Sequence, residues 1–340
     1  MDGKKLTRVN KHKQLGVTFN SKMMFDDHIR ENCKKAMNRI TALKRLHGKL
    51  PRRSKLTIYM SFIRPVLEFG WQLYDNSSNE LLDSLERVQR EGLLLVTSAY
   101  KKTSHNALLH EVGVPLLATR RHTQKIQFMY KYTENKLPPY MNQIIPNIVD
   151  DGAFYNLRNK NNIKVPLSKK NYFLKSFIPS SIKTWNDTNR EVREASSLEA
   201  LKTKLSSIYG INSYRLFLYQ DGKGAVNQSR IRMGLSALNL QRKKYHFIPN
   251  PSCDQCNARS ETPQHFLLYC PAYAVQRNDM LQELSHGVPN ISQLLLNFYN
   301  NNNMSRELVR IMIYGTGKID DDEVIFQAVH LYLEETKCFN

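Results

Sequence analysis

Four residues within one short stretch have the types and the spacing of metal ligands. They follow the pattern C-x2-C-x8-H-x4-C and are Cys253, Cys256, His265 and Cys270. Tetrahedral zinc takes four ligands of these types, and two cysteines three positions apart can both turn their sulfurs to one ion. Because the protein fills all four positions, water and substrate have no place to coordinate. The motif predicts a structural Zn²⁺; the alternative is three buried thiols beside an unrelated histidine.

The residues around this motif predict how its last two ligands are positioned. Thr262 is a good helix N-cap and Pro263 a good first helical residue, which places His265 in the first turn of a short helix. Pro271 disfavours helical geometry at Cys270. We therefore expect Cys270 to leave the helix and bend back to the metal.

The distribution of charge points to a polyanionic partner. The chain carries a net charge of +20, and residues 1–60 hold 16 Lys plus Arg against 4 Asp plus Glu. A strongly basic surface binds phosphate backbones with salt-dependent affinity. The alternative is that Lys-rich helices serve solubility alone. Our candidate phosphate contacts are Arg39, Lys44, Arg45, Arg52, Arg53, Arg230, Arg232, Arg242, Lys243 and Lys244.

Aromatic residues near the cysteine motif are candidates for stacking on unpaired bases. They are Tyr245, Phe247 and Tyr269, although Tyr and Phe at helical spacing more often belong to a core. We assign Trp71 and Trp185 to the core for the same reason.

Composition bounds the class of protein. The 340 residues are 41% hydrophobic and 24% charged, which is ordinary for globular domains. No stretch approaches the roughly 20 apolar residues that cross a bilayer, and residues 1–20 lack the apolar region of a secretory signal. We expect an intracellular protein, nuclear or cytoplasmic, without a membrane partner. Cys33 and Cys338 are then reduced thiols.

Hydrophobic periodicity predicts a mainly α fold that positions these residues. It consists of a short N-terminal strand, a helical bundle, an irregular connector and a second α-helical domain that contains the small zinc knuckle. The strand covers residues 11–19, and because only ten residues precede it, we expect its pairing partner to come from elsewhere. Helices are predicted from residue 25 to about 43, after Pro51 with a kink at Pro65, and over residues 80–96, 103–111, 115–135, 197–209, 226–241 and 321–335. The predicted segments are the N-terminal strand (1–20), the helical bundle (21–137), the connector (138–170), a helical C-terminal region (171–245), the zinc knuckle (246–278) and the C-terminal helices (279–340). We place a domain boundary inside the connector.

The acidic residues do not suggest a catalytic centre. Two-metal catalysis needs carboxylates that converge on paired divalent ions. Asp26 and Asp27 stand where an amphipathic helix begins, and residues 320–323 stand at the start of the last one. Acidic residues in a first helical turn complement the helix dipole. The sequence therefore predicts no complete active site.

Several segments, taken in order, resemble the reverse transcriptases of non-LTR (LINE-type, jockey-like) retrotransposons. The likeness covers roughly residues 8–278 and lies in KHKQLGVTF, FDDHI, LTIYMSFIRPVLEFG, LERVQRE, LLATRRHTQ, YFLKSFIPSSIKTWN, SRIRMGLSALNLQRKKYHF, CDQC, ETPQHFLLYCPAY and Arg277. These segments are similar to the end of the palm, the thumb and the C-terminal cysteine-histidine region of that family. Gln14 departs from the family, which usually has an aromatic residue there.

The resemblance implies a fold and a function. Residues 1–20 would be a remnant of the palm end, and residues 21–137 a thumb-like bundle flanking a template–primer duplex. Leu15 and Gly16 would lie beside the primer-gripping hairpin. The chain would be a fragment that lacks fingers and palm and binds RNA, DNA or both, with the missing palm as a further partner. We predict a non-catalytic nucleic-acid-binding protein. The alternatives are polymerase or endonuclease activity retained within a longer polyprotein, and a protein-interaction scaffold.

Overall fold

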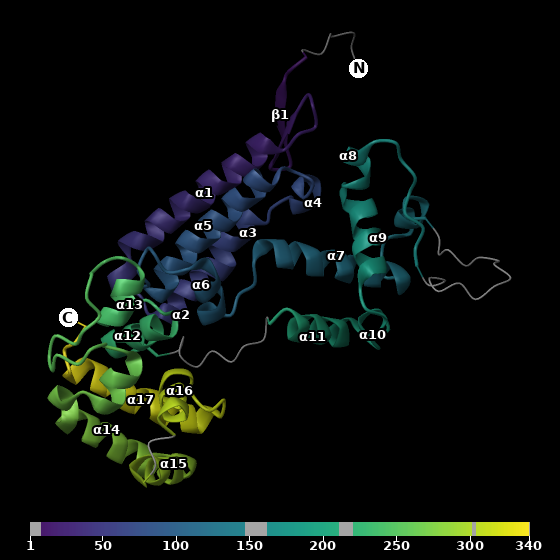
Figure 1. Cartoon of the computed structure of the whole chain (residues 1–340). Coiled ribbons are helices and arrows are strands. Elements are labelled where there is room, and N and C mark those ends of the chain that lie inside the picture. The colour runs from purple at the N-terminus through teal and green to yellow at the C-terminus, as the bar shows by residue number, and fades with distance from the viewer. Residues whose placement is uncertain (1–7, 147–161, 211–219, 301–303, 340) are drawn as a thin grey trace. The chain divides into compact units, whose positions relative to one another are not determined.

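The computed structural model describes residues 8–146, 162–210, 220–300 and 304–339. Across these residues the fold is mainly α, as predicted, with one two-stranded sheet (Figure 1). The chain divides into two compact units. Unit 1 comprises Met1–Ala42, Met60–Gln89 and Val114–Asn212, and unit 2 comprises Leu43–Tyr59, Arg90–Gly113 and Ser213–Asn340.

The N-terminal strand pairs with itself. Strands β1 (Lys11–Gln14) and β2 (Val17–Asn20) are antiparallel, and Gln14 lies opposite Val17. Leu15 and Gly16 form the two-residue turn with φ values of 48° and 83°. Positive φ at both positions is the type I′ geometry whose twist suits a tight hairpin. The expectation that residues 11–19 need a pairing partner from elsewhere is therefore wrong.

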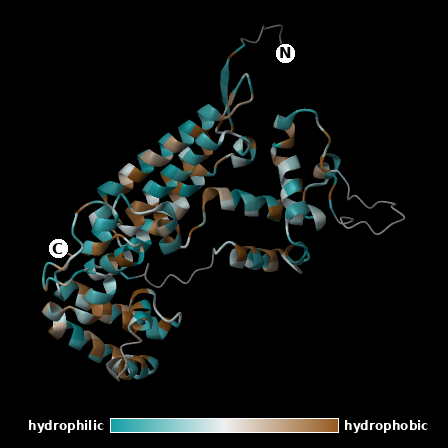
Figure 2. Ribbon diagram, viewed as in Figure 1, coloured by the Kyte–Doolittle hydropathy of each residue, from teal (hydrophilic) through white to brown (hydrophobic). Residues whose placement is uncertain are grey.

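The first helix of unit 1 is long and amphipathic. Helix α1 (Asp26–Arg45) continues from unit 1 into unit 2, and so does α5 (Asn79–Thr97). Phe25, Ile29, Ala36 and Ile40 are buried, whereas Met37 is 36% exposed. Figure 2 shows apolar and polar residues alternating around both helices, the pattern of helices with one buried face. The other helices of unit 1 are α3 (Arg64–Leu67), α4 (Trp71–Tyr74), α7 (Leu117–Thr133), α8 (Asn171–Leu174), α9 (Phe177–Asp187), α10 (Arg190–Arg193) and α11 (Leu198–Ile208), with a 3₁₀ turn at Pro139–Gln143.

The predicted kink at Pro65 takes the form of a widened turn. Helix α2 (Arg52–Ile58) runs into a π-helical turn at Tyr59–Ile63, and α3 follows with Pro65 in its first turn. Proline has no amide proton for the helical ladder, and a π turn is a common way to absorb that loss.

The described ends of the connector, residues 138–146 and 162–170, contribute to the core of unit 1. Ile145 and Ile163 are 1% exposed and lie in the same cluster as Trp185 of α9 and Tyr130 of α7. Asn186 fixes Ile163 further, because its side chain bonds both the amide and the carbonyl at 3.0 and 2.9 Å. The two compact units do not divide within 138–170, where the sequence predicts a domain boundary, because Val114–Asn212 belongs to unit 1. Polar composition suggested a linker there, but a few buried isoleucines outweigh it. Part of the connector, residues 147–161, lies outside the described residues.

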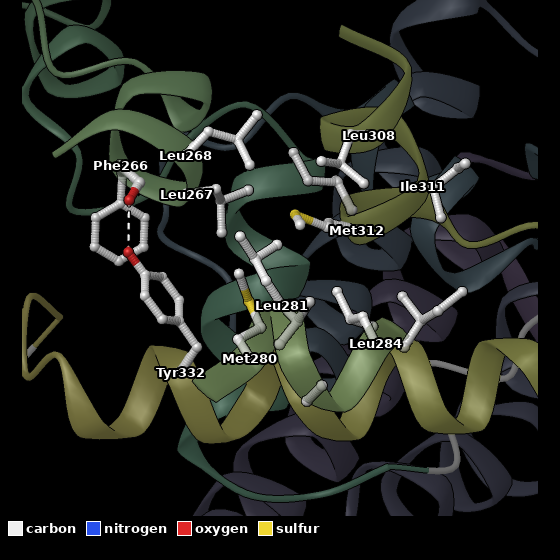
Figure 3. Packing of buried hydrophobic residues seen from close by; sticks show 14 of the residues in the cluster. Phe266, Leu267, Leu268, Met280, Leu281, Leu284, Leu308, Ile311, Met312 and Tyr332 are labelled. Carbon is white, nitrogen blue, oxygen red and sulfur yellow. Dashed lines mark hydrogen bonds between the residues drawn. The ribbon is translucent and has the colours of Figure 1, made fainter. Parts of the chain in front are cut away.

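Unit 2 is built around the last helix. Helix α17 (Ile319–Glu335) packs against α12 (Lys223–Arg232), α14 (Ala274–Gly287) and α16 (Ser305–Tyr314). In the core between them, the Tyr332 hydroxyl donates to the Phe266 carbonyl at 2.5 Å (Figure 3). The remaining elements are α6 (His105–Val112), α13 (Asn239–Lys244), α15 (Pro289–Asn300) and the 3₁₀ turns His47–Lys49 and Pro271–Tyr273. None of the described helices is both long enough and apolar enough to cross a membrane.

The single helix predicted over residues 226–241 is two helices. Gly234, at φ 74°, ends α12, and the amides of Gly234 and Leu235 donate to carbonyls of the last helical turn. This left-handed glycine cap is a frequent helix stop. The second helix, α13, then carries the basic triplet that precedes the cysteine motif.

Candidate metal centre and basic surface

The four predicted ligands come together. The ligand atoms of Cys253, Cys256, His265 and Cys270 all lie within 4.8 Å of one another. Cys253 and Cys256 share a tight turn, in which the Cys253 amide donates to Ala258 and the Cys253 carbonyl accepts from Asn257. This turn brings both sulfurs to one side, as their spacing predicts.

Two of the ligand–ligand distances match those expected around one tetrahedral ion. The sulfurs of Cys253 and Cys270 are 3.9 Å apart, and the Cys256 sulfur lies 3.3 Å from Nε2 of His265. Zinc–sulfur bonds of about 2.3 Å imply sulfur–sulfur edges of about 3.8 Å in a tetrahedron, and edges to nitrogen are slightly shorter. The group could therefore hold one metal ion without large rearrangement.

The third and fourth ligands are positioned as predicted. The Thr262 hydroxyl accepts from the His265 amide at 2.9 Å, which is the N-cap interaction. A π-helical turn, His265–Tyr269, follows, and Cys270 leaves it in extended geometry at φ −63° and ψ 118°. Phe266 in the same turn is fully buried against α17. The ligand turn is thereby anchored in the core of unit 2.

The electrostatics of the group favour a bound cation. Burial raises the pKa of Cys270 to about 12, and the neighbouring thiols add to that rise. Burial also lowers the pKa of His265, which keeps the imidazole neutral and able to ligate. Burial raises the pKa of Cys253 as well, and hydrogen bonds from the backbone amides of Gln255 and Cys256 offset only part of that rise. A divalent cation would stabilise the thiolate forms of the two buried cysteines, Cys253 and Cys270, and of the partly buried Cys256.

A glutamate beside the ligands was not identified from the sequence. Glu261 is 4% exposed; one carboxylate oxygen accepts from the Asn239 amide at 2.8 Å, and the other lies 3.7 Å from the Cys253 sulfur. Glu261 therefore links the first amide of α13 to the metal group. In the sequence, only the position of Glu261 between Cys256 and His265 indicated that it could lie near the ligands. Arg277, which belongs to the resemblance, donates to the Cys270 carbonyl at 2.7 Å.

Two predicted phosphate contacts are buried. Arg52 is 2% exposed, its guanidinium donates to the Gln220 carbonyl, and burial lowers its pKa to about 10. The Arg232 side chain is 3% exposed and pairs with Glu111 at 2.9 Å. A buried arginine that is already paired cannot reach a phosphate at the surface. We therefore remove both residues from the candidate interface and regard them as structural.

The other basic candidates have accessible side chains. In unit 2 the exposed ones are Lys44, Arg45, Arg53, Lys243 and Lys244, and the half-buried ones are Arg230 and Arg242. In unit 1, Arg39 lies over the Phe62 ring at 3.9 Å and donates to the Phe62 carbonyl.

A loop far from α13 in the sequence lies beside it in unit 2. Within residues 98–103, Lys102 donates to the Tyr245 carbonyl at 3.3 Å and stands 4.3 Å from the centre of the Phe247 ring. Tyr100 lies under the guanidinium of Arg230, 4.2 Å from ring centre to Cζ. We did not predict this loop, although its Tyr-Lys-Lys sequence is a weak basic-aromatic signal. We call the following residues the α13 surface: Tyr100, Lys101, Lys102, Arg230, Arg242, Lys243, Lys244 and Phe247.

The stacking candidates differ in accessibility. Phe247 is 49% exposed and Tyr245 is half-buried. Tyr269 is 39% exposed and lies 6.0 Å from the Phe298 ring. Trp71 and Trp185 are 5% and 3% exposed, which confirms that both belong to the core.

Two of the acidic residues at the helix starts, Asp27 and Asp322, have structural roles. Asp27 pairs with Lys11 at 2.8 Å. Asp322 is fully buried and accepts from the amides of Thr316 and Gly317, so it closes the turn before α17. Among the described residues, the Cys/His group is the one set of three or more potential ligands that lie together. Asp26, Asp27 and residues 320–323 therefore do not form a carboxylate cluster.

In comparisons with known proteins, the chain matches no family model, no curated protein and no solved structure.

Proposed function

We propose that the chain is a non-catalytic nucleic-acid-binding protein whose second unit is held together by one structural Zn²⁺. The observation that carries this proposal is the α13 surface, where cations and accessible aromatic rings line one cavity together with Asp254 and Gln255, the two residues between the predicted zinc ligands Cys253 and Cys256. Cations bind phosphates, and aromatic rings stack on unpaired bases. The combination suits a single strand of RNA or DNA.

In this proposal, the bound zinc ion would contribute to binding by holding α13 in place. Glu261 connects the metal group to α13, which carries Arg242, Lys243 and Lys244. An ion that fixes the four ligands would therefore also fix the start of the basic helix. The resemblance to the C-terminal part of non-LTR reverse transcriptases supports the same function, since those enzymes handle RNA and DNA strands.

Charge reversal at the α13 surface tests the binding proposal. We expect Lys243→Glu combined with Lys244→Glu to weaken binding of a labelled mixed-sequence single strand by about tenfold or more at low salt, because phosphate contacts are lost. The salt dependence should also become shallower. Fluorescence anisotropy at two salt concentrations measures both effects.

The chain offers a matched control. Lys169 and Lys170 are also adjacent and exposed, but they lie in unit 1. Reversing them makes the same change in net charge, so we expect a much smaller loss of affinity. Equal losses for the two double variants would mean that the basic charge acts non-specifically and that the α13 surface is not an interface.

Metal analysis tests the zinc proposal. The purified chain should contain one equivalent of zinc, and Cys270→Ser should lose most of it because a ligand is missing. Cys33→Ser, which changes a thiol in unit 1, should keep the full equivalent. A metal-free wild-type chain purified with zinc present would overturn the proposal.

A further inference from the structure

We propose that a cavity in unit 2 binds one unpaired nucleobase of the strand and prefers bases that carry an exocyclic amino group. This inference rests on the proposed function and adds a base-binding subsite to it. Neither the cysteine motif nor the basic triplet requires such a subsite.

The cavity lies between α13, the turn Cys253–Cys256, which we call the knuckle turn, and residues 336–339 near the C-terminus. Its volume is about 760 Å³, within the range of small-molecule sites. Tyr100, Phe247 and Arg242 line one part of it, and Asp254 and Gln255 from the knuckle turn line another. The cavity thus combines aromatic rings, a cation and hydrogen-bonding groups within unit 2.

Each aromatic ring is held by a cation. Lys102 stands over Phe247, and Arg230 stands over Tyr100 while its Nη2 donates to the Ser98 carbonyl at 2.9 Å. Phe247 is 49% exposed and Tyr100 is 36% exposed. A cation on one side of a ring fixes the ring's orientation and leaves accessible ring surface for a base. Rings held in this way lose little further freedom when a base stacks on them.

The polar groups of the cavity determine which bases fit. The Asp254 carboxylate only accepts hydrogen bonds, and the Gln255 side chain both donates and accepts them. Carboxylates accept from amino groups such as N4 of cytosine. Adenine, guanine and cytosine carry an exocyclic amino group, whereas uracil and thymine do not. Glu261 also lines the cavity, but its carboxylate is less available, because one oxygen accepts from the Asn239 amide and the other lies 3.7 Å from the Cys253 sulfur.

The charges of the cavity argue against a free phosphate as its ligand. Asp254 and Glu261 would repel an anion placed among them, although Arg242 and Lys337 also line the cavity. A nucleotide fits both kinds of charge if its uncharged base lies near Asp254 and Glu261 and its phosphate lies near the cations. Exposed Lys243 and Lys244, adjacent in sequence to Arg242, would then contact the neighbouring phosphates.

A fluorescent base reports on stacking directly. A short strand with 2-aminopurine at one central position should lose fluorescence when it binds the wild-type chain, because stacking quenches this base. Phe247→Ala should abolish most of the quenching and weaken binding about tenfold, the lower part of the range for one stacked base. Phe173→Ala is the control, since Phe173 is similarly exposed at 44% but lies in unit 1.

Base preference gives the second measurement. The wild-type chain should bind oligo(C) about five- to tenfold more tightly than oligo(U) at the same salt concentration. Asp254→Asn should reduce this ratio, because an amide presents a donor as well as an acceptor. Equal binding of the two strands together with unchanged quenching in Phe247→Ala would overturn the base site while leaving the polyanion proposal intact. Failure of every strand to bind would overturn both.

Discussion

Arg232 and Arg310 each pair with a glutamate, but their surroundings differ. The side chains of Arg232 and Glu111 are each 3% exposed, and Glu111 also accepts from the hydroxyl of Ser229. The side chains of Arg310 and Glu307 are 53% and 44% exposed. Removing one member of a buried pair leaves an uncompensated charge, whereas water and salt screen an exposed pair.

We expect Arg232→Met to lower the free energy of unfolding by about 3–5 kcal/mol, the usual cost of breaking a buried pair. Arg310→Met should cost less than about 1 kcal/mol. Urea titration of both variants measures the two values. If Arg232→Met were as mild as Arg310→Met, Arg232 would have no structural role and would return to the list of phosphate contacts.

His330 makes the stability of unit 2 sensitive to acid. Its Nε2 lies 2.8 Å from the Gln228 side-chain oxygen, and burial, together with the nearby charges of Arg232 and Arg52, lowers its pKa to about 3. The unfolded chain would protonate this residue near pH 6.5. Below that pH the unfolded state binds a proton that the folded state does not, so stability falls as pH falls toward 3.

The measurement is the free energy of unfolding at pH 7 and at pH 5. From pH 7 to pH 5, the free energy of unfolding should fall by about 1–2 kcal/mol less in His330→Gln than in the wild-type chain, because the variant lacks the titrating group. His286→Gln replaces an exposed histidine of unit 2, and its free energy of unfolding should change between the two pH values as much as that of the wild-type chain. An unchanged pH dependence in His330→Gln would contradict the effect that we assign to burial.

At the scale of elements, α12 and α17 cross with almost no space between their backbones. A Cβ atom added at Gly224 would lie 2.5 Å from the carbonyl oxygen of His330 and 2.7 Å from its Cα. Backbone atoms cannot move aside as a flexible side chain can. The absence of a side chain at Gly224 therefore allows this crossing, which also places Gln228 within reach of His330.

We expect Gly224→Ala to destabilise the protein by about 1–3 kcal/mol, the usual cost of overpacking. Gly48→Ala is the matched control in unit 2, because a Cβ at Gly48 would meet nothing within 4 Å. Its effect should stay within about 0.5 kcal/mol. Thermal unfolding of the two variants distinguishes close helix contact from a general sensitivity to alanine.

At the scale of the whole molecule, the two units have separate cores. The core of unit 1 gathers residues of α7, α9 and α11. The core of unit 2 includes two of the proposed zinc ligands, Cys253 and Cys270, together with Phe266 and residues of α14 and α17. Since metal binding to such a site contributes directly to folding, zinc should stabilise unit 2 selectively.

Removing zinc with a chelator should lower the unfolding temperature of one calorimetric transition and leave another unchanged. Cys270→Ser should reproduce this shift without chelator, and Cys33→Ser should not. Hydrogen exchange assigns the shifted transition to unit 2 if residues 253–285 lose protection and residues 117–133 keep it. A uniform shift of all transitions would show that zinc does not act through the core of unit 2.

Local physical chemistry made much of the architecture predictable from the sequence. Apolar residues recurring every three or four positions predicted most helices, and side-chain caps such as Ser197 set where they begin. The ligand set was predictable because all four residues lie within 18 positions, so a single turn and a short helix bring them together. The nucleic-acid contacts and the resemblance to reverse transcriptases remain predictions.

Tertiary structure decided which charges are available and which surfaces form. Arg52 and Arg232 look like surface cations in the sequence, but each guanidinium is buried against an acceptor more than a hundred residues away, the Gln220 carbonyl for Arg52 and the Glu111 carboxylate for Arg232. The same holds for Lys102 and Tyr245, which are 143 positions apart and in contact. Helical periodicity reports only which side of one helix is apolar. Desolvation of a charge and the walls of a cavity depend on groups from distant segments, and these meet only when the whole unit folds.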